Sequence, residues 1–165
     1  MMTIAQAFAM ELQHEAANTR KMLARVPMDK ASWTPHAKSM TLSALASHVA
    51  EIFTWFRITI HQNELDFATM DYKPFVPNST EELLAFFDKN LADALESLNA
   101  VEDAKMFENW TMRQGDQIFF TLPKAAVVRT WCFSHMIHHR GQLSVYLRQL
   151  DVPVPGMYGP TADEQ

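Results

Sequence analysis

The architecture can be inferred outward from the stretch SHMIHHRGQ, residues 134–142, which lies inside an apolar helical pattern running from Pro123 to about Leu150. His135 and His139 stand four residues apart, so in a helix they are separated by about 40° around the axis and by one turn along it. Both fall on the face that the apolar residues of this helix assign to the core. The spacing therefore allows two imidazoles to reach one ion.

A third imidazole is expected from another helix. His48 interrupts the inward face of the predicted second helix between Leu45 and Ile52. Three neutral imidazoles would leave coordination positions open for water or substrate, as catalytic metal sites require. Imidazole suits zinc, nickel, copper and iron, so the ligand type alone does not select the ion. We predict one divalent metal ion held by His48, His135 and His139.

Two alternatives stay open at this cluster. A histidine at a helix interface is more often a hydrogen-bonded core residue than a metal ligand, and the four-residue spacing is common by chance. His138 follows His135 by three residues and could replace His139 as a ligand, although it points about 100° away from His139. We place His138 at a pocket wall or a helix interface. The remaining histidines are expected in solvent: His14, His36 and His61.

Three further segments show helical periodicity. Their expected bounds are residues 4–26, residues 39 or 41 to 61, and residues 79–98. A capping box of Ser79 and Glu82 predicts the start of the third helix. The linker 62–78 could stretch about 55 Å, whereas a 20-residue helix is about 30 Å long, so the second and third helices can run parallel through a crossover. We predict an all-α four-helix bundle with a long crossover.

A small β-hairpin is expected between the third and fourth helices. Residues 110–112 and 118–120 are rich in aromatic and β-branched side chains, and they flank the turn sequence Gln-Gly-Asp at 114–116. An isolated hairpin is marginally stable unless it packs on something else.

The composition excludes several classes of function. The chain has 165 residues, enough for one domain spanning residues 1–165, and its formal net charge of −5 argues against a nucleic-acid partner. No apolar run is long enough to cross a membrane. The single cysteine, Cys132, excludes an internal disulfide and fits a reducing compartment. The N-terminus lacks a signal pattern. We therefore expect a cytoplasmic protein. Neither Gly-rich nucleotide-binding motif, GxGxxG nor GxxxxGK, occurs.

Several polar residues near the predicted site deserve separate interpretations. Glu51 follows His48 by one turn. It is open to three interpretations: a fourth metal ligand, a hydrogen-bond acceptor behind the ligands, or a surface carboxylate. Glu15 and Thr19 interrupt the apolar seam of the first helix, where we favour pocket lining over burial with polar partners. Cys132, one turn before His135, either joins the metal as a thiolate or is a small buried residue, and we favour the buried residue. Arg140 either binds an acidic group or forms a surface ion pair. The candidate catalytic residues, as carriers of protons, are Glu51, Glu15 and His138.

Four motifs together resemble the DinB/YfiT-like superfamily of metal-dependent four-helix-bundle enzymes. They are Trp33-Thr34-Pro35, the stretch 45–48 (LASH), the stretch 135–142 ending in HHRGQ, and the tail 152–160 (VPVPGMYGP). The resemblance spans almost the whole chain. It implies an up-down-down-up bundle, often a homodimer, with His48, His135 and His139 as the metal triad and zinc or nickel as the usual ion.

The resemblance also implies a chemistry, because characterised relatives include transferases and isomerases that use low-molecular-weight thiols. Our leading hypothesis is a metal-dependent transferase that acts on a small-molecule substrate with such a thiol. A metal-dependent hydrolase, in which the ion activates water, is the second hypothesis. The third is a non-catalytic binding module that the metal stabilises.

Overall fold

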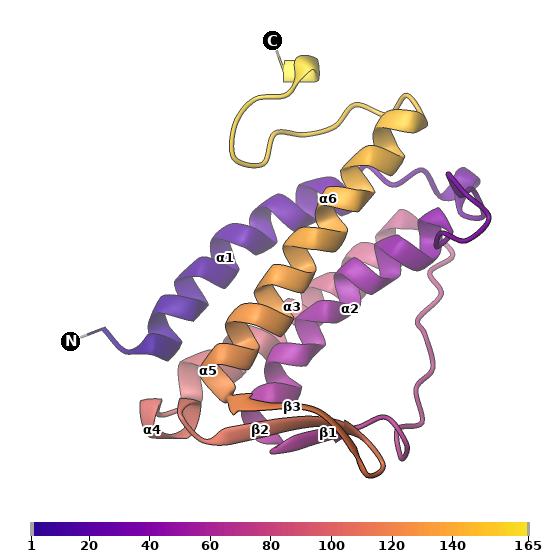
Figure 1. Ribbon diagram of the computed structural model, residues 1–165. Coiled ribbons are helices and arrows are strands. Elements are labelled where there is room, and N and C mark those ends of the chain that lie inside the picture. The colour runs from indigo at the N-terminus through magenta and orange to yellow at the C-terminus, as the bar shows by residue number, and fades with distance from the viewer. Residues whose placement is uncertain (1, 165) are drawn as a thin grey trace.

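The computed structural model describes residues 2–164, and four long helices dominate it. These helices are α1 (Ile4–Leu23), α2 (Leu42–His61), α3 (Thr80–Ala100) and α6 (Ser134–Gln149). Figure 1 shows α1 and α6 running in one direction and α2 and α3 in the other. The predicted up-down-down-up bundle, with a long crossover between α2 and α3, is therefore confirmed.

Side-chain caps begin α2 and α3, as the sequence indicates. The Thr41 hydroxyl accepts a hydrogen bond from the backbone N–H of Ala44 at 3.2 Å, so α2 begins from Thr41 and not from Ser39. Ser79 accepts from the N–H of Glu82 at 3.2 Å, but the Glu82 carboxylate accepts from the N–H of Asn78 instead of that of Ser79. The predicted capping box is therefore only half formed.

The last predicted helix is interrupted. Pro123 precedes a short helix, α5 (Lys124–Val127), and a π-helical turn (Val128–Phe133) then leads into α6. A π-turn adds a residue to one turn and so rotates the residues that follow relative to those before it. The expectation of one regular helix from Pro123 was wrong in this respect. The first helix also ends earlier than predicted, at Leu23, because the next residues make i→i−3 hydrogen bonds.

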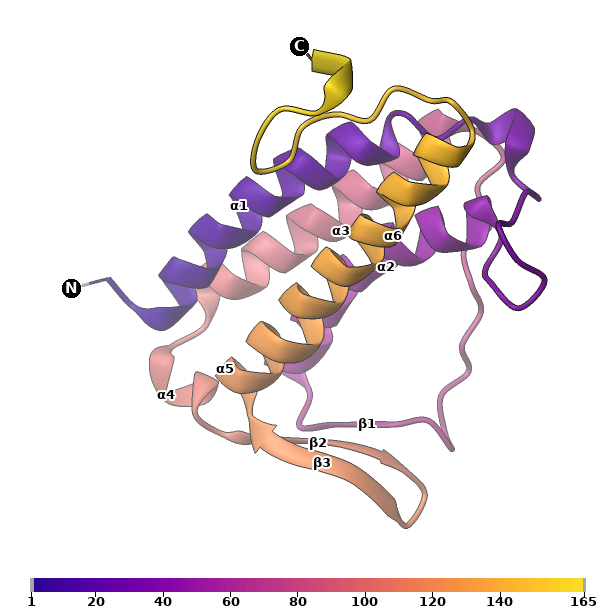
Figure 2. The same ribbon diagram turned by 45° about the horizontal axis from the view of Figure 1, so that its top comes forward.

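A three-stranded sheet lies across one end of the bundle (Figure 2). Strands β2 (Asn109–Gln114) and β3 (Gln117–Pro123) form the predicted hairpin, with Gly115 in the left-handed region at φ 57°. The sequence analysis missed the third strand, β1 (Glu64–Asp66), which comes from the crossover and pairs with β2 in parallel. The hairpin thereby gains the neighbour that it needs to be stable.

The crossover is attached to this sheet at a second point. The Asp66 carboxylate accepts hydrogen bonds from the backbone N–H groups of Ala68 and Gly115, both at 2.9 Å. These bonds hold the pKa of Asp66 below its usual value. The segment after β1 starts from this attached point, and it lines part of the cavity described below.

Aromatic side chains fill the centre of the bundle. Phe53 meets Phe87 edge-on at 4.7 Å, which joins α2 to α3, and Phe56 meets Phe133 edge-on at 4.9 Å, which joins α2 to the π-turn. All four are fully buried. Within residues 2–164, no helix combines the length and the apolar character needed to span a membrane.

Candidate metal centre

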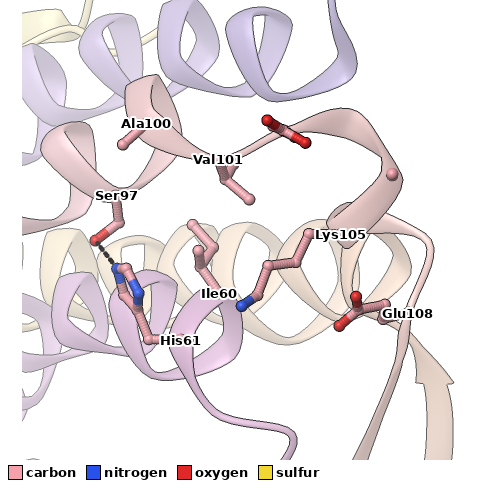
Figure 3. Close-up of a pocket in the computed structure, with 9 residues that line it drawn as sticks. Ile60, His61, Ser97, Ala100, Val101, Lys105 and Glu108 are labelled. Carbon is pink, nitrogen blue, oxygen red and sulfur yellow. Dashed lines mark hydrogen bonds between the residues drawn. The ribbon is translucent and has the colours of Figure 1, made fainter.

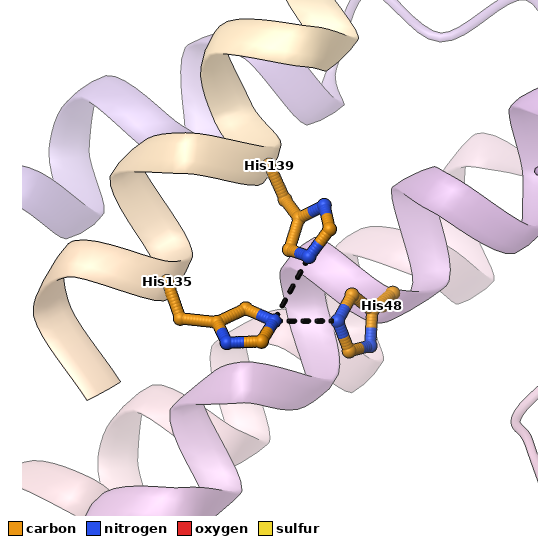
Figure 4. A group of neighbouring side chains, drawn as sticks. All are labelled: His48, His135 and His139. Carbon is orange, nitrogen blue, oxygen red and sulfur yellow. Dashed lines mark hydrogen bonds between the residues drawn. The ribbon is translucent and has the colours of Figure 1, made fainter. Parts of the chain in front are cut away.

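The three predicted ligands converge, as Figure 4 shows. The Nε2 atom of His135 lies 3.3 Å from Nε2 of His48 and 2.8 Å from Nε2 of His139. One ligand atom from each residue lies within 4.8 Å of the other two. Zinc–nitrogen bonds of about 2.0–2.1 Å in a tetrahedral site place ligand nitrogens about 3.3 Å apart, so the spacing is of the right size for one ion.

The hydrogen bonds behind the imidazoles make the Nε2 atoms acceptors. Nδ1 of His139 lies 2.7 Å from Oε1 of Gln142, and because an amide oxygen only accepts, Nδ1 carries the proton and Nε2 keeps a lone pair. Nδ1 of His48 faces Oε2 of Glu51 at 3.7 Å, and this carboxylate favours a proton on the same side. At least two lone pairs thus point at a common centre, where a cation would stabilise them. The residues fit a divalent metal.

The surroundings of His135 and His139 favour the neutral form of both rings. Burial, followed by the neighbouring histidines His139, His48 and His138, lowers the pKa of His135 to about 4. Burial also lowers the pKa of His139, although the Gln142 hydrogen bond opposes that shift. Neutral imidazole is the form that binds a metal ion.

Glu51 lies behind the triad. Its side chain is 18% exposed, and its Oε2 atom accepts a hydrogen bond from the hydroxyl of Tyr72 at 2.8 Å. Burial, with the Glu51 bond as a further cause, raises the pKa of Tyr72 to about 12. Of the three interpretations of Glu51, the structure supports a carboxylate behind His48 and does not support a surface carboxylate, because the side chain is mostly buried and faces Nδ1 of His48. Sequence analysis missed Tyr72, because it belongs to the crossover.

A cavity of about 600 Å³ opens beside the triad. His48 and His135 line it, together with Glu51 and Tyr72. Its volume is within the range of about 300–1,000 Å³ that is usual for small-molecule sites. Two imidazoles of the triad, those of His48 and His135, are therefore accessible to a small molecule from this side.

Glu15 and Thr19 do not line that cavity. Arg140 donates to the Glu15 carboxylate at 2.6 Å, to the Glu15 carbonyl at 3.0 Å and to the Thr19 hydroxyl at 3.0 Å. The Tyr158 hydroxyl of the C-terminal tail also donates to Glu15, at 2.9 Å. Our preference for pocket lining was wrong, because both residues are buried with polar partners. Arg140 binds an acidic group, but the ion pair is buried and not at the surface.

The structure also places the other residues of the cluster. His138 is exposed, and its ring lies 4.8 Å from that of His139, outside the triad, so the prediction of a pocket wall or helix interface was wrong. Cys132 is fully buried as expected, and burial raises the pKa of its thiol to about 12. A role for Glu51, Glu15 or His138 in proton transfer stays a prediction.

A second hollow, of about 460 Å³, lies at the other end of α2 (Figure 3). His61 contributes to it, and its Nε2 lies 3.0 Å from the Ser97 hydroxyl. That hydroxyl donates to the Asp93 carbonyl, so it accepts from the imidazole. Thirteen residues of helix separate His61 from His48, which is about 20 Å. This hollow is therefore distinct from the triad.

Comparisons with known proteins agree with this fold. The family model of the DinB family matches residues 1–165. The structure is similar to that of a DinB-like protein from Bacillus cereus ATCC 10987, with a TM-score of 0.68 and 24% identity, covering 92% of this chain and 95% of the other. It is also similar to a DinB-like protein from Bacillus subtilis, with a TM-score of 0.71 and 15% identity, covering 96% and 99%.

Fold and site together define a four-helix-bundle protein with a histidine triad that could hold a metal ion. The chain belongs to the DinB family. A shorter match links it to the uncharacterized protein YrdA of Bacillus subtilis (strain 168), with 53% identity over 30 residues. That match spans 18% of each chain.

Proposed function

We propose that His48, His135 and His139 hold one divalent metal ion, zinc or nickel, and that the protein transfers a low-molecular-weight thiol onto a small-molecule electrophile. The observation that carries the proposal is the convergence of three Nε2 atoms at the end of a cavity of small-molecule size. A metal ion bound there supplies positive charge that lowers the pKa of an entering thiol.

The thiol of the chain's one cysteine is unsuitable as the nucleophile, which supports an external thiol. Its one cysteine, Cys132, is fully buried, and a pKa of about 12 keeps it protonated at neutral pH. In the reaction, the sulfur of the external thiol forms a bond to the electrophilic carbon, and the leaving group departs with the electron pair of the broken bond.

The proton of the thiol passes to a carboxylate of the protein and then to water. Glu51 suits this role best among the three predicted carriers, because it lines the cavity together with His48. Glu15 is bound by Arg140 and Tyr158, and His138 is exposed outside the triad. The Tyr72 hydroxyl holds the Glu51 carboxylate in place.

Metal analysis of untagged protein by mass spectrometry is the first test, beside the double variant His48→Ala/His135→Ala. We expect about one zinc or nickel ion per wild-type chain and none in the variant. Protein that binds no metal even after incubation with several divalent ions would contradict the proposed site.

The reaction is tested with metal-loaded protein, several small thiols and 1-chloro-2,4-dinitrobenzene as the electrophile, where a C–S bond forms as the C–Cl bond breaks. We expect a rate above background that the double variant loses. Background rates with all thiols would contradict the transferase. Hydrolysis of ester probes without any thiol would indicate the hydrolase instead.

A further inference from the structure

The cavity beside the triad is lined by imidazoles and, over most of its remaining wall, by apolar side chains. The indole ring of Trp55 lies edge-on to the ring of His135 at 4.8 Å and stacks on the indole of Trp131 at 4.3 Å with planes 9° apart, and both indoles line the cavity. Further apolar side chains of α2 and of the crossover belong to the same wall: Ile58, Leu65, Phe67 and Met70. A ligand that reaches the triad therefore places the rest of its surface against indole rings and aliphatic groups.

The charges of the lining residues restrict the ligand further. No lysine or arginine is among the described residues that line the cavity, and the one carboxylate among them is Glu51, at the triad end. An anionic group packed against the indoles and aliphatic side chains would lose its hydration without gaining an ion pair. The cavity therefore selects against a ligand that carries negative charge away from the triad.

Access is from the side of the crossover. Phe67 and Met70 line the cavity and are 41% and 39% exposed, so they lie at its mouth. Tyr72 closes the crossover onto α2 through its bond to Glu51. A ligand entering here meets an aromatic ring and a thioether first, and both favour flat apolar groups.

We infer that this cavity binds an uncharged ligand with an aromatic or other flat apolar group, packed against Trp55 and Trp131 while its reactive end faces His48 and His135. We assign this ligand as the electrophile of the reaction, and that assignment rests on the proposed function. The thiol then approaches from the triad end.

Two fluorescent probes with the same ring skeleton test the inference: neutral N-phenyl-1-naphthylamine and 8-anilino-1-naphthalenesulfonate, which adds one negative charge. Both are titrated into the protein as purified and after chelation of metals. We expect one neutral probe per chain, and a dissociation constant at least 10-fold higher for the sulfonate. Equal or tighter binding of the sulfonate would overturn the inference.

Variants locate the binding. Trp55→Ala is expected to weaken the neutral probe at least 10-fold, whereas Phe107→Ala, at an exposed aromatic residue after α4 (Asp103–Met106), leaves it unchanged. Met70→Arg changes an exposed position at the mouth, and it is expected to strengthen sulfonate binding about 10-fold. Folding of each variant is checked by circular dichroism. Folded variants that bind both probes like the wild type would overturn the inference.

These titrations need neither a metal ion nor a thiol, so they fail separately from the proposed function. A protein that prefers the neutral probe through Trp55 but transfers no thiol would contradict the transferase alone. A protein that transfers thiols but binds the sulfonate equally well would contradict the ligand class alone.

Discussion

Replacing Arg140 by leucine is expected to destabilise the protein strongly. The side chains of Arg140 and Glu15 are only 3% and 8% exposed, and their closest atoms lie 2.6 Å apart. Arg140 also donates to the Thr19 hydroxyl and to the Tyr158 hydroxyl, so the guanidinium joins α6, α1 and the C-terminal tail. Removing one partner of such a pair leaves the other charge buried and uncompensated.

The magnitude follows from this burial. Breaking a buried ion pair typically costs about 3–5 kcal/mol, a large share of the roughly 5–15 kcal/mol that holds a domain folded. At about 2–4 °C per kcal/mol for a chain of this size, the melting temperature of Arg140→Leu should fall by roughly 10 °C. The double variant Glu15→Leu/Arg140→Leu removes both charges and should recover much of the loss.

Urea unfolding of wild type, both single variants and the double variant gives the coupling free energy between the two residues. We expect about 2 kcal/mol or more. A coupling below about 0.5 kcal/mol would refute the argument, because it would mean that the pair is solvated and that Glu15 is free for another role.

Three further predictions concern other parts of the molecule. Gln142→Ala should weaken zinc or nickel binding about 10- to 100-fold in a chelator competition, because it removes the acceptor that orients His139. Gln142→Glu should keep the metal affinity. Unchanged affinity in the alanine variant would count against this orientation. Iodoacetamide at pH 8.5 should leave Cys132 unmodified in folded protein and alkylate it fully in urea, since burial raises the pKa of its thiol to about 12; rapid alkylation of folded protein would show that the thiol is accessible. Burial, and then the nearby Arg57, lowers the pKa of His61 below 6.5. The stability that neutral His61 contributes is therefore present above pH 6.5 and is lost as the pH falls through the lower pKa of the folded protein. A His61→Asn variant should lose less stability than the wild type over that pH range. An identical pH profile would contradict the assignment.

Local pattern was enough to predict much of the fold. The caps at Thr41 and Ser79, the apolar periodicity and the turn at Gly115 act between residues close in the chain, and each produced the expected helix or hairpin. The length of the linker at residues 62–78 allowed a parallel crossover, because chain geometry limits what a linker can span, and the family resemblance supplied the order of the helices. The π-turn before α6 has no such local signal, and it was missed.

In the candidate site, too, some features were predictable from local sequence and others were not. The spacing of His135 and His139 places both on one face of one helix, so their proximity is a local property of the sequence. Periodicity identified His48 as inward-facing, but only packing of α2 against α6 brings its Nε2 atom within 3.3 Å of His135. The partner that holds Glu51, Tyr72, lies 21 residues away in the crossover, where no periodic pattern indicates its direction.

The sequence by itself determined four helices, a hairpin and two imidazoles one turn apart, because hydrogen bonding and side-chain direction repeat at fixed short intervals. Tertiary structure decided what those elements surround. It placed Glu15 against Arg140, 125 residues later, and not in a pocket. It also placed a segment of the crossover along the wall of the cavity beside His48. Such contacts depend on how whole helices pack, and many different distant residues satisfy the same local pattern.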